Sequence, residues 1–126
     1  MFDVQKHVVY WLEGAAEELE VANELLADGR TRHGLFFLHL TIEKVMKAHV
    51  CQTTAAVPPK IHNLLRLSEL AGLSMTQEDR DFLGELSLFN MEGRYPDTYG
   101  ALPPDPDVQR IQQETERIYQ WLRNQL

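Results

Sequence analysis

The segment from Thr31 to Cys51 constrains the fold more than any other part of the chain, because apolar residues cover most of its circumference. Its centre reads GLFFLHLTIEKVMKAHV. A surface helix carries one apolar stripe, whereas a helix that is apolar over a wide arc must pack on more than one side. We therefore expect a central helix here. Its apolar residues are Leu35, Leu38, Ile42, Val45 and Met46, flanked by Phe36, Phe37 and Leu40.

The boundaries of the other helices are predicted from residues that cap or end helices. Asp3 is placed to cap the first helix, and Gly29 is placed to end it. Thr76 begins another helix, with an acidic residue three positions later as in a capping box. Asp105 followed by Pro106 predicts an N-cap with proline at the first helical position. The helices other than the central one are expected at residues 4–26, 60–71, 76–91 and 106–122.

These segments together predict the fold class. No stretch alternates apolar and polar residues between hairpin turns, so no sheet is expected. Five amphipathic helices with short connections are typical of an all-α fold, here an up-and-down bundle of four to five helices. The 126 residues are enough for one domain, residues 1–126, with a core of its own.

Composition narrows the class of protein. Apolar residues make up 44% and charged residues 25%, the balance of a soluble globular protein. Charges recur every few residues near the N-terminus, which argues against a signal peptide or a membrane span and favours a cytoplasmic protein. Cys51 is the single cysteine, so neither an internal disulfide nor a cysteine-based zinc site is expected. Without a Walker loop, a glycine fingerprint or a nucleophile motif, no cofactor is predicted.

Charge is distributed unevenly along the chain, whose formal net charge is −7. Residues 30–66 hold six of the twelve Lys and Arg side chains but one of the nineteen acids, which gives +5 there and −12 elsewhere. Such asymmetry favours an anionic partner at one face, or an acidic protein surface that docks there. The alternative is a solvated helix face without a partner.

Three charged or titratable residues of the central helix share one face. His39, Glu43 and Lys47 are spaced i, i+4, i+8. An ordinary Glu–Lys helix pair would need no function. Yet a charged row on so apolar a helix must face a cleft, a partner or a countercharge, because burying it unpaired is costly. Both interpretations remain open from the sequence. A third metal ligand is missing beside His39 and Glu43, so no metal site is predicted.

Three stretches together resemble the HEPN domain family. They are FFLHLTIEKVMKAHV, PPKIHNLLRLSELAGL (which includes His62 at the start of a helix) and RYPD at residues 94–97. The resemblance extends from about residue 4 to residue 122. It implies a bundle of four to five helices, usually a homodimer. Such domains often act as the partner of a separately encoded minimal nucleotidyltransferase, as in a toxin–antitoxin pair, and several members are RNA-cleaving toxins.

The nuclease members of that family carry an arginine followed four to six residues later by histidine, and a dimer brings two such motifs into one cleft. Arg94 matches the arginine, but Tyr99 stands where the histidine is expected. Arg32 and His39 fit the bare spacing on another helix, which we interpret as coincidence. Tyrosine stays protonated near neutral pH and is a poor acid or base there. The resemblance therefore implies nucleotide or RNA binding without cleavage. The alternative is an endoribonuclease with a degenerate motif.

The stretch NMEGRYPDTYG is expected to end the fourth helix. Tyr95 precedes Pro96, which disfavours helical dihedrals at Tyr95. This exit would hold Arg94 at a corner facing the row on the central helix. There Arg94 would either clamp a phosphate together with Lys47 or pair with Glu43. The candidate set for a phosphate or nucleotide ligand is His39, Glu43, Lys44, Lys47, His62, Arg94, Tyr95 and Tyr99.

Assembly is predicted from the same central helix. Its wide apolar arc exceeds what a small bundle is expected to cover, so we expect a homodimer with an apolar interface. A further interpretation is a pure dimerisation module whose basic face docks an acidic partner.

Overall fold

The computed structural model describes residues 1–126. It contains five α-helices and one short 3-10 helix, with no strand, which confirms the all-α class. In chain order the elements are α1 (Val4–Ala27), α2 (Thr31–Thr54), α3 (Leu64–Leu70), α4 (Gln77–Ser87), the 3-10 helix η1 (Pro96–Thr98) and α5 (Asp105–Arg123).

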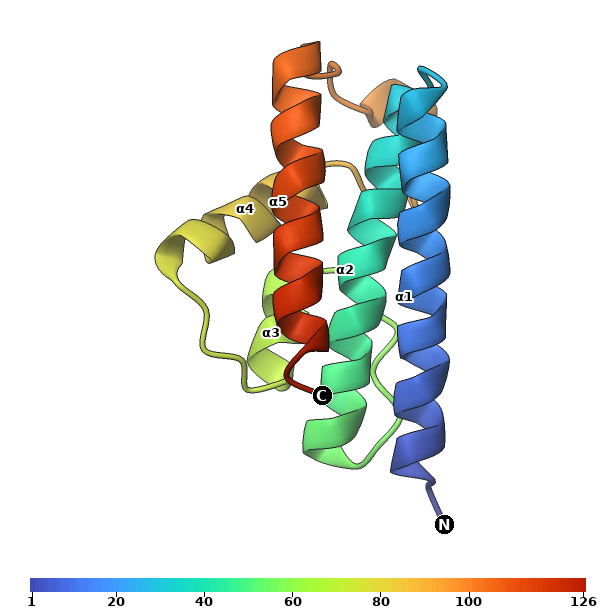
Figure 1. The fold of residues 1–126 in the computed structure, drawn as a ribbon, viewed down its shortest axis with the longest axis vertical. Coiled ribbons are helices and arrows are strands. Elements are labelled where there is room, and N and C mark those ends of the chain that lie inside the picture. The colour runs from blue at the N-terminus through green and yellow to red at the C-terminus, as the bar shows by residue number, and fades with distance from the viewer.

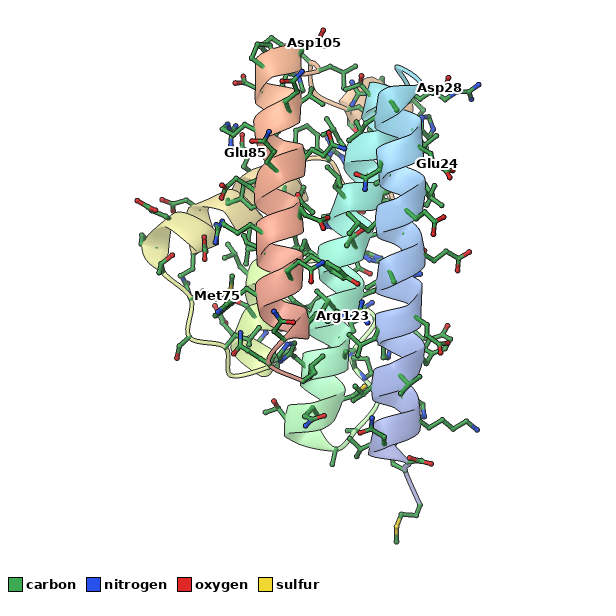
Figure 2. All side chains as sticks on the ribbon, in the orientation of Figure 1. Glu24, Asp28, Met75, Glu85, Asp105 and Arg123 are labelled. Carbon is green, nitrogen blue, oxygen red and sulfur yellow. The ribbon has the colours of Figure 1, made fainter.

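The long helices α1, α2 and α5 lie alongside one another, and the short helices α3 and α4 pack against α2 as well (Figure 1). α1 and α2 run in opposite directions. α5 runs in the same direction as α2: its Gln112 donates a hydrogen bond to Asn23 of α1, and its Leu122 carbonyl accepts one from His49 of α2. Figure 2 shows Asp105 and Asp28 at one end of the bundle and Arg123 towards the other.

α2 is the centre of the core. It contacts each of the other four α-helices, and 14 of its 24 residues are buried. Each fully buried leucine or isoleucine stabilises the fold by about 1.5–3 kcal/mol relative to an exposed one. The central residues of the apolar arc are therefore buried within one chain, whereas Phe36, Phe37 and Leu40, which widen it, are half-buried. None of the helices combines the length and apolar character that a membrane crossing requires.

Most of the predicted helix signals are confirmed. The Asp3 carboxylate accepts a hydrogen bond from the Lys6 backbone N–H, and Thr76 caps α4 in the same way. Gly29, just after α1, has a φ of +77°, a conformation that costs glycine little. These confirmed positions are local, since each depends on residues within one helical turn.

Four predicted boundaries are wrong. α2 ends at Thr54 rather than at Cys51. α3 begins at Leu64 rather than near residue 60, because the Asn63 side chain caps it by accepting from the Arg66 backbone N–H. α4 ends at Ser87 rather than near residue 91. Asp105 lies inside α5, whose N-cap is Pro104 with no side-chain hydrogen bond.

Candidate functional site

The charged row on α2 forms a buried network with the segment that precedes α3. The Glu43 carboxylate accepts hydrogen bonds from Lys47 Nζ at 3.1 Å and from His62 Nδ1 at 3.0 Å. The side chains of Glu43 and Lys47 are only 5% and 8% exposed. A buried charge of this kind needs a close partner, and each supplies one to the other. The row therefore faces countercharges within the protein.

His39 completes this network as a neutral group. Its Nε2–H donates to the His62 carbonyl oxygen at 3.2 Å, and its side chain is fully buried. Its Nδ1 has no hydrogen-bond partner and lies 3.9 Å from Glu43 Oε1. Burial lowers the pKa of His39 below its ordinary value, and the neighbouring Glu43 carboxylate only partly opposes this. His39 thus fixes the segment before α3 against α2.

The two lysines of α2 that were predicted to bind a ligand, Lys44 and Lys47, both contact α1. Lys47 Nζ lies 5.3 Å from the centroid of the Trp11 ring, within cation–π range. Lys44 Nζ donates to Glu18 of α1 at 2.6 Å. The aliphatic part of the Lys44 side chain lies over Gly14, where an added Cβ would lie 3.1 Å from it. Both ammonium groups are therefore engaged in packing α1 on α2.

The turn that follows α4 is organised by Arg94. Its Nη1 donates to the carbonyl oxygens of Leu88 at 3.0 Å and Asn90 at 3.3 Å, and its Nη2 donates to Thr98. Tyr95 has the extended conformation expected before a proline, with φ −82° and ψ 146°. The guanidinium thus closes the turn from inside, as a cross-link between three carbonyl groups.

A phosphate clamp made by Arg94 and Lys47 stays a prediction, although Lys47 is buried in an ion pair. The predicted ion pair between Arg94 and Glu43 is wrong, because Arg94 donates to carbonyl groups instead. Two physical reasons account for this. Lys47 and Glu43 satisfy each other in the core, and α4 ends early enough that the carbonyls of the following turn surround the guanidinium instead.

A second arginine lies beside the same turn. Arg32, in the first turn of α2, donates from Nη2 to the Gly100 carbonyl at 2.7 Å. The guanidinium carbons of Arg32 and Arg94 lie 5.2 Å and 5.6 Å from the centroid of the Tyr99 ring. Neither arginine has a carboxylate partner. Two positive charges therefore gather around one aromatic ring. The sequence interpretation missed Arg32, although its place in the basic segment was a signal.

These two arginines line a surface hollow of about 350 Å³. One acid, Glu85, also lines it, but that carboxylate accepts two hydrogen bonds from Arg110 of α5, at 3.0 and 2.6 Å. Figure 2 shows Glu85 beside α5. The electrostatic character of the hollow is thus set by the unpaired arginines. Its lining residues are Arg32, Glu85, Leu88, Phe89, Arg94, Thr98, Gly100, Ala101 and Pro103.

Some N–H donors of Arg32 and Arg94 form no hydrogen bond within the protein. A guanidinium has five N–H donors. Arg94 uses three of them on carbonyls, and Arg32 uses one. The remaining donors suit the oxygens of a phosphate or a carboxylate, which guanidinium groups bind through charge-assisted hydrogen bonds. The hollow is therefore equipped for an anion.

The remaining predicted site residues, His62 and Tyr95, lie at the buried network and in the turn after α4. His62 contacts Glu43 and also, through Nε2 at 2.9 Å, Glu92 in the turn after α4. Tyr95 is 79% exposed. No group of three or more His, Cys, Asp or Glu side chains is arranged to hold a metal ion.

The positive charge of residues 30–66 is largely paired within the protein, and an anionic partner at this segment stays a prediction. Four of its six basic side chains form ion pairs within the protein. Pairing of this kind cancels much of the field that the count of charges suggests. The four are Arg30 with Asp28, Lys44 with Glu18, Lys47 with Glu43 and Arg66 with Glu69.

Comparison with known proteins supports the fold. The model of the HEPN domain family matches residues 8–125. Among solved structures, the crystal structure of an archaeal HEPN homologue superposes with a TM-score of 0.69 at 22% sequence identity, covering 94% of this chain and 96% of that one. No curated protein matches the sequence.

Proposed function

This chain belongs to the HEPN domain family, and we propose that it binds a nucleotide or a single-stranded RNA without cleaving it. The binding site in this proposal is the hollow between Arg32 and Arg94. The observation that carries the proposal is the pair of arginines around Tyr99, since both lack a carboxylate partner and both keep free donors. In the cell, the domain would present this ligand to a separately encoded minimal nucleotidyltransferase.

The size and chemistry of the hollow support this class of ligand. Its volume of about 350 Å³ lies at the small end of the range for ligand pockets, roughly 300–1,000 Å³. Leu88 and Phe89 give it an apolar wall for a base, and the guanidinium groups supply N–H donors for a phosphate. Tyr95, at 79% exposure, is free to stack on a neighbouring base.

The absence of a proton-transfer group at the hollow supports binding without cleavage. No histidine lines it, and Tyr99 occupies the position where nuclease members of the family have one. His62, which contacts the turn after α4, already has a carboxylate at each ring nitrogen. General acid–base catalysis needs a group that exchanges protons near neutral pH and reaches the substrate. The arginines alone provide charge and position.

Self-association belongs to the same proposal. Two large apolar side chains that remain exposed, Tyr10 and Val57, line a separate hollow together with Trp11. A homodimer formed there would cover these side chains and leave Leu88 and Tyr95 free for the ligand. Light scattering at tens of micromolar tests it, and a monomer at that concentration would remove the dimer from the proposal.

Binding is tested with a fluorescent 2′-O-methyl oligonucleotide, which a ribonuclease cannot cleave through its 2′ oxygen. Arg32→Ala should weaken binding by about 1–3 kcal/mol, the scale of a charge-assisted hydrogen bond. It should also reduce the salt dependence by about one phosphate contact. Arg66→Ala is the matched control, because it removes the same charge from an exposed pair with Glu69. Equal losses in the two variants would reduce the effect to net charge and remove the hollow as the site.

A further inference from the structure

His62 connects the buried network on α2 to the turn that carries Arg94. Its Nδ1 lies 3.0 Å from Glu43 Oε1 and its Nε2 lies 2.9 Å from Glu92 Oε2. Glu92 belongs to the same turn, where its backbone N–H also donates to the Asn90 side chain at 3.2 Å. The imidazole ring is thus the link between a fixed helix and the ligand-binding turn.

The two contacts together require a charged imidazole. A neutral histidine carries one N–H and can donate to one carboxylate only, whereas the imidazolium has two N–H donors. With a neutral ring, one nitrogen lone pair would face a carboxylate oxygen at about 3 Å with no proton between them. Both contacts are satisfied only when His62 is protonated. Histidine is the side chain whose charge ordinarily changes between about pH 5 and pH 8.

The turn is joined to α2 at two points: Arg32 donates to the Gly100 carbonyl at its C-terminal end, and His62 contacts Glu92 beside Arg94. Arg94 itself is held by the carbonyl oxygens of Leu88, Asn90 and Thr98, all within the same turn. These bonds fix the guanidinium relative to the turn. The contact from His62 to Glu92 fixes the part of the turn that carries Arg94 relative to α2, on which Arg32 lies. The spacing between the two arginines therefore depends on this contact as well as on the hydrogen bond from Arg32 to Gly100.

We propose that His62 is a positioning residue for the ligand-binding turn, and that its protonated form holds Arg94 in register with Arg32. This inference rests on the proposed function, because it concerns regulation of the same hollow. Anion binding should then be stronger when the ring carries two N–H donors than when it carries one.

The charged and titratable groups around His62 are consistent with this direction. Glu43 of α2 and Glu92 of the turn after α4 contact the two ring nitrogens, while Lys47 is paired with Glu43 and His39 is buried and neutral. In α3, which begins two residues after His62, Arg66 is paired with Glu69. The ring is thus contacted by a carboxylate at each nitrogen.

The test is the pH profile of binding, measured with the 2′-O-methyl oligonucleotide made without terminal phosphates, so that the charge of the probe is constant between pH 6.0 and 8.0. The wild-type protein should bind about three- to fivefold more weakly at pH 8.0 than at pH 6.0, the scale of a partly exposed ion pair. His62→Gln should bind with nearly the same affinity at both values. His33→Gln is the control, because His33 is an exposed histidine next to Arg32, and its profile should match the wild type.

A measurement without ligand separates failure of this inference from failure of the proposed function. Heteronuclear NOEs of the backbone amides at residues 90–98 should fall in the wild type as the pH rises from 6.0 to 8.0, and should be low at both values in His62→Gln. If the oligonucleotide does not bind but the NOEs behave in this way, the hollow is not its site and the positioning role stands. If the NOEs of the wild type do not change with pH, or if His62→Gln keeps the wild-type profile, the inference is overturned.

Discussion

Glu43→Gln should destabilise the protein substantially, because it leaves Lys47 as an uncompensated charge in the core. The two side chains are 5% and 8% exposed, and their oxygen and nitrogen atoms are 3.1 Å apart. Removing one partner of a buried pair costs about 3–5 kcal/mol. The glutamine oxygen can still accept one hydrogen bond, and the Trp11 ring still attracts the ammonium group, so the lower end of this range applies. We expect a loss of about 3 kcal/mol.

Urea denaturation followed by circular dichroism measures this loss. With a slope of about 2 kcal/mol per molar urea, the midpoint should fall by about 1.5 M. Glu69→Gln is the matched control, because the Arg66–Glu69 pair is also within one helix but is 57% and 50% exposed. Its free energy of unfolding should change by less than about 0.5 kcal/mol. If the two variants lose the same stability, Glu43 does not act as a buried counterion and the reasoning fails.

Three further predictions concern packing and protonation. Gly34→Ala should lower the free energy of unfolding by about 1–3 kcal/mol, because its Cβ would lie 2.5 Å from a side chain of α1. The Cβ of Gly84→Ala would meet nothing within 4 Å, so this variant should be neutral or stabilising in thermal unfolding. Burial lowers the pKa of His39 and His49 below 6.5, so the stability that they contribute is complete above about pH 6.5. It declines at lower pH, because the unfolded chain takes up protons before the folded one does. Imidazole NMR titrations with midpoints at or above 6.5 would contradict this. Burial also raises the pKa of the Cys51 thiol, so a thiol reagent should label it only on unfolding, and rapid labelling of the native protein would refute its burial.

The helices and the buried network were predictable because they depend on short-range spacing. Periodicity at 3.6 residues places the apolar residues of α2 in the core, and the i, i+4, i+8 spacing places His39, Glu43 and Lys47 on one face. The sequence left open whether that row faces a ligand or a countercharge. In the structure Glu43 is paired with Lys47 of the same helix and is contacted by His62 from the segment before α3.

The hollow was not predictable, because it depends on where the chain goes after α4. Arg94 was expected to face α2, but its partners are the carbonyl groups of its own turn. Arg32 and Gly100 are 68 positions apart in the sequence, and no local pattern indicates that they meet. The count of basic residues between positions 30 and 66 also misled, since it carries no information on which of them pair with acids from other elements.

Incubation of the purified protein with a single-stranded RNA, without metal ions, tests the central claim most directly. Wild type, Arg94→Ala and Tyr99→Phe are compared for both binding and cleavage of the same RNA. The account predicts that the wild type binds, that Arg94→Ala binds more weakly by about 1–3 kcal/mol, and that none of the three proteins cleaves. Cleavage by the wild type that is abolished in Arg94→Ala would contradict it and would identify the protein as an endoribonuclease.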